Sequence, residues 1–298
     1  MTTSDASVLL FFIDGLGIGT RGPHNPLDNL PDAAPLAVFQ NETPEIYLEG
    51  IVVPTDPRLG IEGRPQSASG QTTILTGINA PATIGYHKQG FPNKPLLEII
   101  SQHSIFKQLG EAGVEPVTFA NAYTSGFFSE RPRWISATTA AVEAANLRFR
   151  TMDDVRNDNA VFMDYTNRML IERGEDVAPR TEQEAASVLS RIVAQNRFTL
   201  YEYFITDKAG HAQDMPLAKT ILTSLALFLR ETLIRLDLKR TTVILTSDHG
   251  NIEDLSSRNH TLNAVPTIVW GAQRERIATS IRNLADITPA IVALLTNK

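Results

Sequence analysis

Short apolar runs alternate with amphipathic stretches along most of the chain. Apolar runs of strand length, typical of strands buried on both faces of a sheet, occupy residues 7–13, 114–120, 199–205, 241–246 and 265–270. Stretches with helical spacing occupy residues 104–112, 181–196, 216–237 and 284–296. Because strands and helices alternate, the pattern predicts an α/β fold with a mostly parallel sheet sandwiched by helices.

Local signals refine three of these elements. Pro116 lies inside the second apolar run and cannot donate a ladder hydrogen bond, so we expect an edge strand or a bulge there. Thr181 and Glu184 form a capping-box pattern at the start of the second helical stretch. Pro216 suits the first turn of the long helix that follows.

Residues 123–180 interrupt this alternation, because they are rich in polar and charged residues and lack strand-like runs. We interpret them as a small cap inserted into a core domain that comprises residues 1–122 and 181–298. The alternative is a solvated helical excursion with no role in substrate binding.

Composition limits the classes of function. The 298 residues are 42% hydrophobic and 20% charged, as in an ordinary globular protein, and the net charge of −6 argues against a nucleic-acid binder. With no cysteine, the chain has no thiolate metal site, disulfide or cysteine nucleophile. No apolar run is long enough for a signal peptide or a membrane span, so we expect a cytoplasmic protein without a membrane partner.

Acidic residues and histidines flank the predicted strands. The carboxyl ends of parallel strands meet at one edge of a sheet, where ligands bind. Carboxylates and neutral imidazoles suit zinc, manganese and related ions, and two such ions about 3.5–4 Å apart can assist an in-line phosphoryl displacement. The sequence therefore predicts a site for two divalent cations, with six candidate ligands: Asp14, Asp207, His211, Asp248, His249 and His260.

A hydroxyl-rich segment, QSASGQTTILTG at residues 66–77, is the candidate source of a nucleophile. Its ordinary interpretation is a Ser/Thr-rich loop that caps a helix at 70–76. A hydroxyl at a helix N-terminus is also favoured as an alkoxide by the helix dipole and by a nearby metal. Because no G-x-S-x-G elbow occurs, we expect a metal to activate it.

Together these segments resemble the alkaline phosphatase superfamily, especially the branch of cofactor-independent phosphoglycerate mutase and phosphopentomutase. The resemblance covers residues 7–122 and 181–298. It is carried by FIDGLG, PQSASGQTTILTG, FITDKAGHAQD, TSDHGNIED and NHTLNAVPTIVWG.

The resemblance implies an alkaline-phosphatase-like core and a role for each candidate residue. It selects Ser67, rather than Ser69, as the catalytic nucleophile, from the spacing to Gly77. It implies that one metal is held by Asp207, His211 and His260. The other metal is then held by Asp14, Asp248, His249 and the Ser67 oxygen.

Two departures separate the chain from the mutases. The glycerate mutases carry a much longer insertion, and the mutases have a histidine where this chain has Gln71. We therefore expect a metal-dependent hydrolase that acts on a small phosphate mono- or diester through a phosphoserine on Ser67. A phosphomutase acting on phosphoglycerate or a sugar phosphate is the first alternative, and a non-catalytic metal-binding protein is the second. Lys208 either faces the anionic substrate or is solvated.

Overall fold

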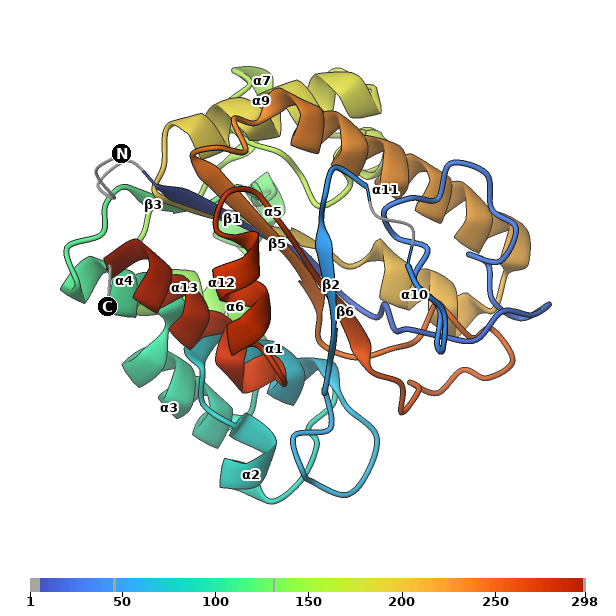
Figure 1. Ribbon diagram of the computed structural model, residues 1–298. Coiled ribbons are helices and arrows are strands. Elements are labelled where there is room, and N and C mark those ends of the chain that lie inside the picture. The colour runs from blue at the N-terminus through green and yellow to red at the C-terminus, as the bar shows by residue number, and fades with distance from the viewer. Residues whose placement is uncertain (1–5, 45–46, 131, 297–298) are drawn as a thin grey trace.

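The computed structural model describes residues 6–44, 47–130 and 132–296 (Figure 1). Its described strands form one six-stranded sheet in the order β2-β6-β5-β1-β4-β3. The strands are β1 (Ser7–Ile13), β2 (Ile51–Thr55), β3 (Val117–Phe119), β4 (Phe198–Tyr203), β5 (Thr241–Ser247) and β6 (Val265–Trp270).

Most of the sheet is parallel, as predicted. β1 pairs in parallel with both β4 and β5, so that Val8 lies opposite Phe198 on one side and Thr242 on the other. β3 also runs parallel to β4. β6 is antiparallel to β5, and β2 is antiparallel to β6. The antiparallel direction of β6 brings its first residue to the sheet edge where β5 ends.

Helices cover both faces of the sheet (Figure 1). One face carries α9 (Glu182–Ala194) and α11 (Met215–Arg235). The other carries α1 (Ser67–Thr76), α3 (Lys94–His103), α4 (Ile105–Glu111), α6 (Ala137–Ala144), α12 (Arg274–Ser280) and α13 (Ile287–Thr296), with the short α2 (Ala80–Ile84) beside α1. The predicted α/β sandwich is therefore confirmed.

Side chains of β1 divide between the two hydrophobic cores because successive residues of a strand point to opposite faces. Leu9, Phe11 and Ile13 pack in the core under α9 and α11. Val8, Leu10 and Phe12 pack in the core under the other helical layer. All these side chains are buried, which explains why β1 is a continuous apolar run rather than an alternating one.

Element boundaries differ from the predictions in several places. The strand expected to reach residue 205 ends at Tyr203, and a helix, α10 (Ile205–Ala212), follows at once. The helix expected at 70–76 begins at Ser67. The apolar stretch at 284–296 divides into a 3-10 turn (Leu284–Asp286) and α13.

Other local predictions are confirmed. The strand near Pro116 is short and lies at the edge of the sheet, where a missing N–H donor has no partner to lose. Thr181 and Glu184 form the capping box of α9, in which the Thr181 amide donates to the Glu184 carboxylate at 2.8 Å.

Between β3 and α9 the chain forms short helices: α5 (Ser125–Ser129), α6, α7 (Met152–Arg156) and α8 (Arg168–Glu172). Met152, Val155, Phe162 and Leu170 share a small hydrophobic cluster in this segment. α6, in contrast, packs against α1, α3 and α4 in the main helical layer. The segment thus combines a small cluster of its own with one helix that joins the core.

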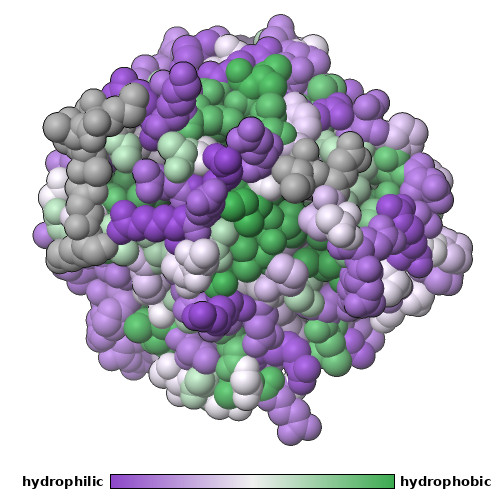
Figure 2. Space-filling view, viewed as in Figure 1, coloured by the Kyte–Doolittle hydropathy of each residue, from purple (hydrophilic) through white to green (hydrophobic). Residues whose placement is uncertain are grey.

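Polar residues cover most of the face seen in Figure 2, with hydrophobic residues gathered near its centre. Among the described residues, no helix has the length and hydropathy required to cross a lipid bilayer.

Candidate metal centre

Three parallel strands deliver candidate ligands to one edge of the sheet. Asp14 directly follows β1, and Asp248 and His249 directly follow β5. β4 lies on the other side of β1 and leads into α10, which carries Asp207 in its first turn. The Thr206 hydroxyl donates to the Asp14 carbonyl at 2.5 Å and so ties α10 to the end of β1.

The first group of ligand atoms surrounds Nε2 of His249. Ser67 Oγ lies 2.9 Å from this nitrogen and Asp14 Oδ1 lies 3.2 Å from it. Asp248 Oδ2 lies slightly farther away, at 3.6 Å. Asp14, Asp207 and His249 each offer one ligand atom within 4.8 Å of the others. The hydroxyl, the carboxylates and the imidazole thus face one small volume.

The second group is formed by Asp207, His211 and His260, whose ligand atoms also lie within 4.8 Å of one another. Asp207 and His211 are four residues apart on α10 and therefore share one face of that helix. His211 Nε2 lies 3.3 Å from Asp207 Oδ2, and His260 Nε2 lies 3.5 Å from Asp207 Oδ1. Asn251 donates to Asp207 Oδ1 at 2.6 Å, which orients the carboxylate.

The two groups adjoin. Asp207 belongs to both of them. The rings of His249 and His260 stack with centroids 3.7 Å apart and an interplanar angle of 12°. The structure therefore brings all seven residues named from the sequence, Asp14, Ser67, Asp207, His211, Asp248, His249 and His260, into one continuous cluster.

The hydrogen bonds of the histidines fit metal ligation. His211 Nδ1 lies 2.7 Å from the Arg258 carbonyl, and His260 Nδ1 lies 2.9 Å from the Pro65 carbonyl. Because a carbonyl oxygen only accepts, each Nδ1 carries a proton, and in the neutral ring Nε2 is then the nitrogen that can bind a metal, as in metal-binding histidines. The Nε2 atoms of His211 and His260 lie 3.3 Å apart. One cation could therefore contact both nitrogens.

The clustered carboxylates of the site also favour the binding of cations. Among the described residues, no Arg or Lys forms an ion pair with Asp14, Asp207 or Asp248. Burial raises the pKa of the Asp248 carboxyl well above its usual range, and the nearby Asp14 charge adds to this. Burial lowers the pKa of His249, but the charges of Asp248 and Asp14 outweigh it and the net pKa is raised. Asp14 Oδ1 is buried without a hydrogen-bond partner. Divalent cations would satisfy these atoms.

Gln71 has a role at the centre that the sequence analysis missed. Its side-chain amide donates to Asp14 Oδ2 at 3.0 Å and to Asp248 Oδ2 at 3.2 Å, so one neutral group bridges two candidate ligands. The only sequence signal was that the mutases have a histidine at this position. The preceding Gly70 permits this approach, because a Cβ there would lie only 3.0 Å from the Asp248 side chain and carbonyl.

Glu253 is a second residue whose role was not predicted. Its buried carboxylate accepts hydrogen bonds from the Gly17 amide at 2.9 Å, the Asn251 amide at 2.7 Å, the Thr261 hydroxyl at 2.5 Å and the Asn263 side chain at 3.0 Å. These partners lie in two loops, the one that follows β1 and the one that connects β5 to β6. One carboxylate thus joins the two loops that carry Asp14, Asp248, His249 and His260.

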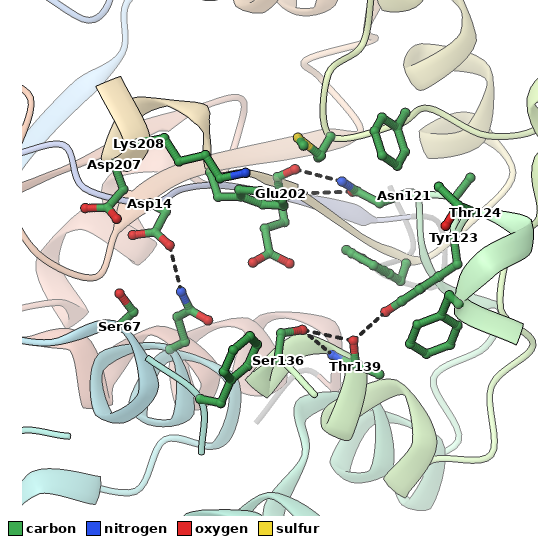
Figure 3. Close-up of a pocket in the computed structure, with 18 of the residues that line it drawn as sticks. Asp14, Ser67, Asn121, Tyr123, Thr124, Ser136, Thr139, Glu202, Asp207 and Lys208 are labelled. Atoms are coloured by element: carbon green, nitrogen blue, oxygen red, sulfur yellow. Dashed lines mark hydrogen bonds between the residues drawn. The ribbon is translucent and has the colours of Figure 1, made fainter. Parts of the chain in front are cut away.

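A cavity of about 510 Å³ opens beside Ser67, Asp14 and Asp207 (Figure 3). Aromatic side chains form much of its wall, and we call it the aromatic cavity after them: Phe91, Phe119, Tyr123, Phe127, Phe162 and Phe204. Several of these residues come from the segment between β3 and α9.

Glu202 lies in the wall of the aromatic cavity and is only 7% exposed (Figure 3). Burial raises the pKa of Glu202 to about 7; the Thr138 hydroxyl opposes this rise and the Asp14 charge adds to it. The sequence analysis took this residue as part of an apolar strand. An acidic residue within that run was the signal that could have revealed it.

Comparisons with known proteins agree with this geometry. Residues 157–298 match the family model of the Metalloenzyme superfamily. A curated relative, the 2,3-bisphosphoglycerate-independent phosphoglycerate mutase of Dinoroseobacter shibae, is 31% identical over 121 residues. That alignment covers 38% of this chain and 24% of the mutase, so the chain matches only about a quarter of that enzyme.

Solved structures share the fold over nearly the whole chain. The alkaline phosphatase of the Antarctic bacterium TAB5 has a TM-score of 0.51 at 14% identity, covering 97% of this chain and 98% of the phosphatase. The lipoteichoic acid synthase LtaP of Listeria monocytogenes has a TM-score of 0.55 at 11% identity, covering 98% of this chain and 72% of the synthase. The fold is alkaline-phosphatase-like, and the resemblance found in the sequence is confirmed.

Proposed function

We propose that the protein is a two-metal phosphoryl-transfer enzyme that hydrolyses phosphate mono- or diesters through a phosphoserine on Ser67. The observation that carries this proposal is the convergence of Ser67 Oγ and Asp14 Oδ1 on His249 Nε2, at 2.9 and 3.2 Å. The Metalloenzyme superfamily match and the alkaline-phosphatase-like fold support metal-dependent chemistry of this class.

The proposed ligand sets follow the two groups of atoms. Asp207, His211 and His260 would hold one cation. The other would be held by Asp14, Asp248, His249 and the Ser67 oxygen. The donors suit zinc or manganese. Divalent cations bound here would stabilise the negative charge that develops on the phosphoryl oxygens and favour ionisation of the Ser67 hydroxyl.

The position of Ser67 supports the proposal that it is the nucleophile. It is the first residue of α1, where free backbone amides and the positive end of the helix dipole favour a bound phosphoryl group. In the proposed reaction, Ser67 Oγ forms a bond to phosphorus while the bond to the alcohol oxygen breaks and the alcohol leaves with a proton. Water then attacks the phosphorus of this intermediate and restores the Ser67 hydroxyl. The product released is phosphate from a monoester, or a phosphate monoester from a diester.

The proposed substrate is a small phosphorylated molecule bound in the aromatic cavity. The core of residues 1–122 and 181–298 supplies the seven ligand and nucleophile residues. The segment 123–180 supplies Tyr123, Phe127 and Phe162 to the cavity wall. These contributions support its assignment as a cap with a role in substrate binding.

The test is to load purified protein with zinc or manganese, supply an aryl phosphate and look for phosphate on Ser67 by mass spectrometry after acid quenching. Ser67→Ala should lower turnover roughly 10³-fold or more. Ser69→Ala is the matched control, because the Ser69 hydroxyl is engaged with the Gln66 carbonyl and the Lys88 amide. Full turnover by Ser67→Ala, or less than one bound metal per chain, would overturn the proposal.

A phosphomutase is the second candidate function, and the alignment with a phosphoglycerate mutase favours it. A mutase would return the phosphoryl group of the same phosphoserine to another hydroxyl of the substrate. Incubation with isotopically labelled phosphoglycerates or sugar phosphates separates the two outcomes. Positional transfer without release of phosphate indicates a mutase, and release of phosphate indicates a hydrolase.

A further inference from the structure

The aromatic cavity is polar at one end and aromatic toward the other. Figure 3 shows Ser67, Asp14 and Asp207 at one end and Tyr123 at the opposite end. The Tyr123 ring packs against Phe127 with centroids 4.5 Å apart and against Phe119 at 6.1 Å. If the phosphate of a substrate lies at Ser67, the organic group attached to it therefore contacts the aromatic side chains of the cavity.

Polar groups in this wall are largely engaged with one another. The Tyr123 hydroxyl lies 3.0 Å from the Thr139 hydroxyl, which lies 2.9 Å from that of Ser136. The Asn121 side chain donates to the Glu202 carbonyl at 2.7 Å and accepts from the Glu202 amide at 3.0 Å. Few of these groups remain to bind the several hydroxyls of a sugar.

Away from the metal end, the charged residues of the wall are Glu202, Arg173 and Lys208. Glu202 lies between the two ends of the cavity, and Asp14 and Asp207 lie at the metal end (Figure 3). The basic residues of the wall, Arg173 and Lys208, are exposed, and the Lys208 ammonium lies over the Phe204 ring at 4.8 Å. No buried cation is available among the described wall residues to pair with a carboxylate or second phosphate.

We propose that the substrate is a phosphate ester of an apolar alcohol, alkyl or aryl, whose organic group fills the aromatic cavity. The proposal rests on the function proposed above and narrows its substrate class. Pockets of roughly 300–1,000 Å³ hold ligands of drug size, so a cavity of about 510 Å³ accommodates far more than the phosphoryl group. Phosphoglycerates and sugar phosphates, being charged or richly hydroxylated, fit this wall poorly.

The test uses a series of n-alkyl phosphates from ethyl to octyl. The leaving alcohols differ little in acidity, so the series varies apolar area and leaves the chemical step nearly constant. We expect kcat/KM of the metal-loaded enzyme to rise by about fourfold per methylene until the cavity is full. 3-Phosphoglycerate and glucose 6-phosphate should react roughly tenfold more slowly than hexyl phosphate, or slower still.

Two exposed phenylalanines supply matched variants. Phe91 lines the aromatic cavity and is 50% exposed, whereas Phe128 is 48% exposed and is not among the lining residues. Because both side chains are half in solvent, replacing either one with serine should leave the fold intact. Phe91→Ser should reduce the preference for hexyl over ethyl phosphate by roughly three- to tenfold, and Phe128→Ser should leave it unchanged.

Binding of n-alkylphosphonates, measured by calorimetry on the metal-loaded protein, gives a second readout that requires no turnover. If phosphonate affinity rises with chain length while no ester is hydrolysed, the cavity proposal stands and the proposed hydrolysis fails. A different result is that ethyl phosphate is hydrolysed in a Ser67-dependent way, but neither kcat/KM of the phosphates nor the affinity of the phosphonates changes with chain length. The proposed hydrolysis is then supported and the proposed apolar substrate class is wrong.

Discussion

The hydroxyl oxygen of Ser67 lies 2.9 Å from Nε2 of His249, and Asp14 Oδ1 lies 3.2 Å from that same nitrogen. In a serine-hydrolase triad the serine and the carboxylate contact opposite nitrogens of the imidazole. Here both contact one nitrogen, while Nδ1 faces the Gly250 carbonyl at 3.4 Å. Three groups that converge on one point are arranged as ligands around a cation, which is why we propose metal activation of the serine.

Removing one histidine should separate the two proposed metals. His211→Ala should lower the metal content by about one ion per chain and leave the group around His249 loaded, because His211 belongs only to the second group. The measurement is elemental analysis after metal-replete purification. His103→Ala, which removes an exposed histidine of α3, is the control and should retain full metal content. Equal losses in both variants would contradict the assignment.

Metal removal should destabilise the fold. Ligands that bind only the native state stabilise it, by about 2.7 kcal/mol when present at 100 times their dissociation constant. A chelator should therefore lower the melting temperature of the wild-type protein, and the shift should be smaller for His211→Ala. Calorimetry with and without chelator provides the comparison, and identical melting curves would count against bound metal.

Glu253→Gln should weaken metal binding although Glu253 is not a proposed ligand. An amide replaces one acceptor oxygen by a donor, so part of the four-bond network that joins the ligand loops is lost. We expect metal affinity to fall about 10–100-fold, as for other residues that orient ligands. Competition with a chromogenic chelator measures this. Asp254→Asn removes the same charge from the neighbouring residue, whose carboxylate accepts a hydrogen bond from the Ser256 amide, and should change affinity little.

Glu202 should make the stability of the metal-free protein depend on pH. Its folded pKa of about 7 lies above its ordinary value of 4.5, so the folded state retains a proton that the unfolded state has lost. The stabilising contribution of Glu202 is therefore complete below about pH 4.5 and is lost as the pH rises toward 7, a change of about 3 kcal/mol. Denaturant titrations at several pH values should show that Glu202→Gln removes this fall. The exposed variant Glu98→Gln should keep it.

Gly70→Ala should reveal how closely α1 approaches β5. Alanine normally stabilises a helix interior by about 1 kcal/mol relative to glycine. At Gly70 the added methyl group would lie 3.0 Å from the buried Asp248, so α1 must shift and disturb the Gln71 bridge. We expect no gain in stability and weaker metal binding. Gly110→Ala, in α4, meets nothing within 4 Å and should show the ordinary stabilisation. A similar gain at both positions would refute the close approach.

The alternation of strands and helices, and the helical layer on each face of the sheet, follow from local patterns in the sequence. Strands such as β1 are buried on both faces. Successive residues are therefore apolar, and this continuous run can be recognised from the sequence alone. The candidate ligand residues could also be recognised in the sequence, because Asp14 and Asp248 directly follow such runs and Asp207 and His211 have helical spacing. Each of these features depends only on residues that are close together in the sequence.

The way in which these residues come together depends on contacts between elements that are distant in the chain. The antiparallel direction of β6 places the loop bearing His260 beside the end of β5, and no local pattern distinguishes an antiparallel buried strand from a parallel one. Gln71, Glu202 and Glu253 act through partners far away in the sequence. Their roles follow from burial and from hydrogen bonds between loops, which cannot be predicted from the composition of the chain or the spacing of its residues.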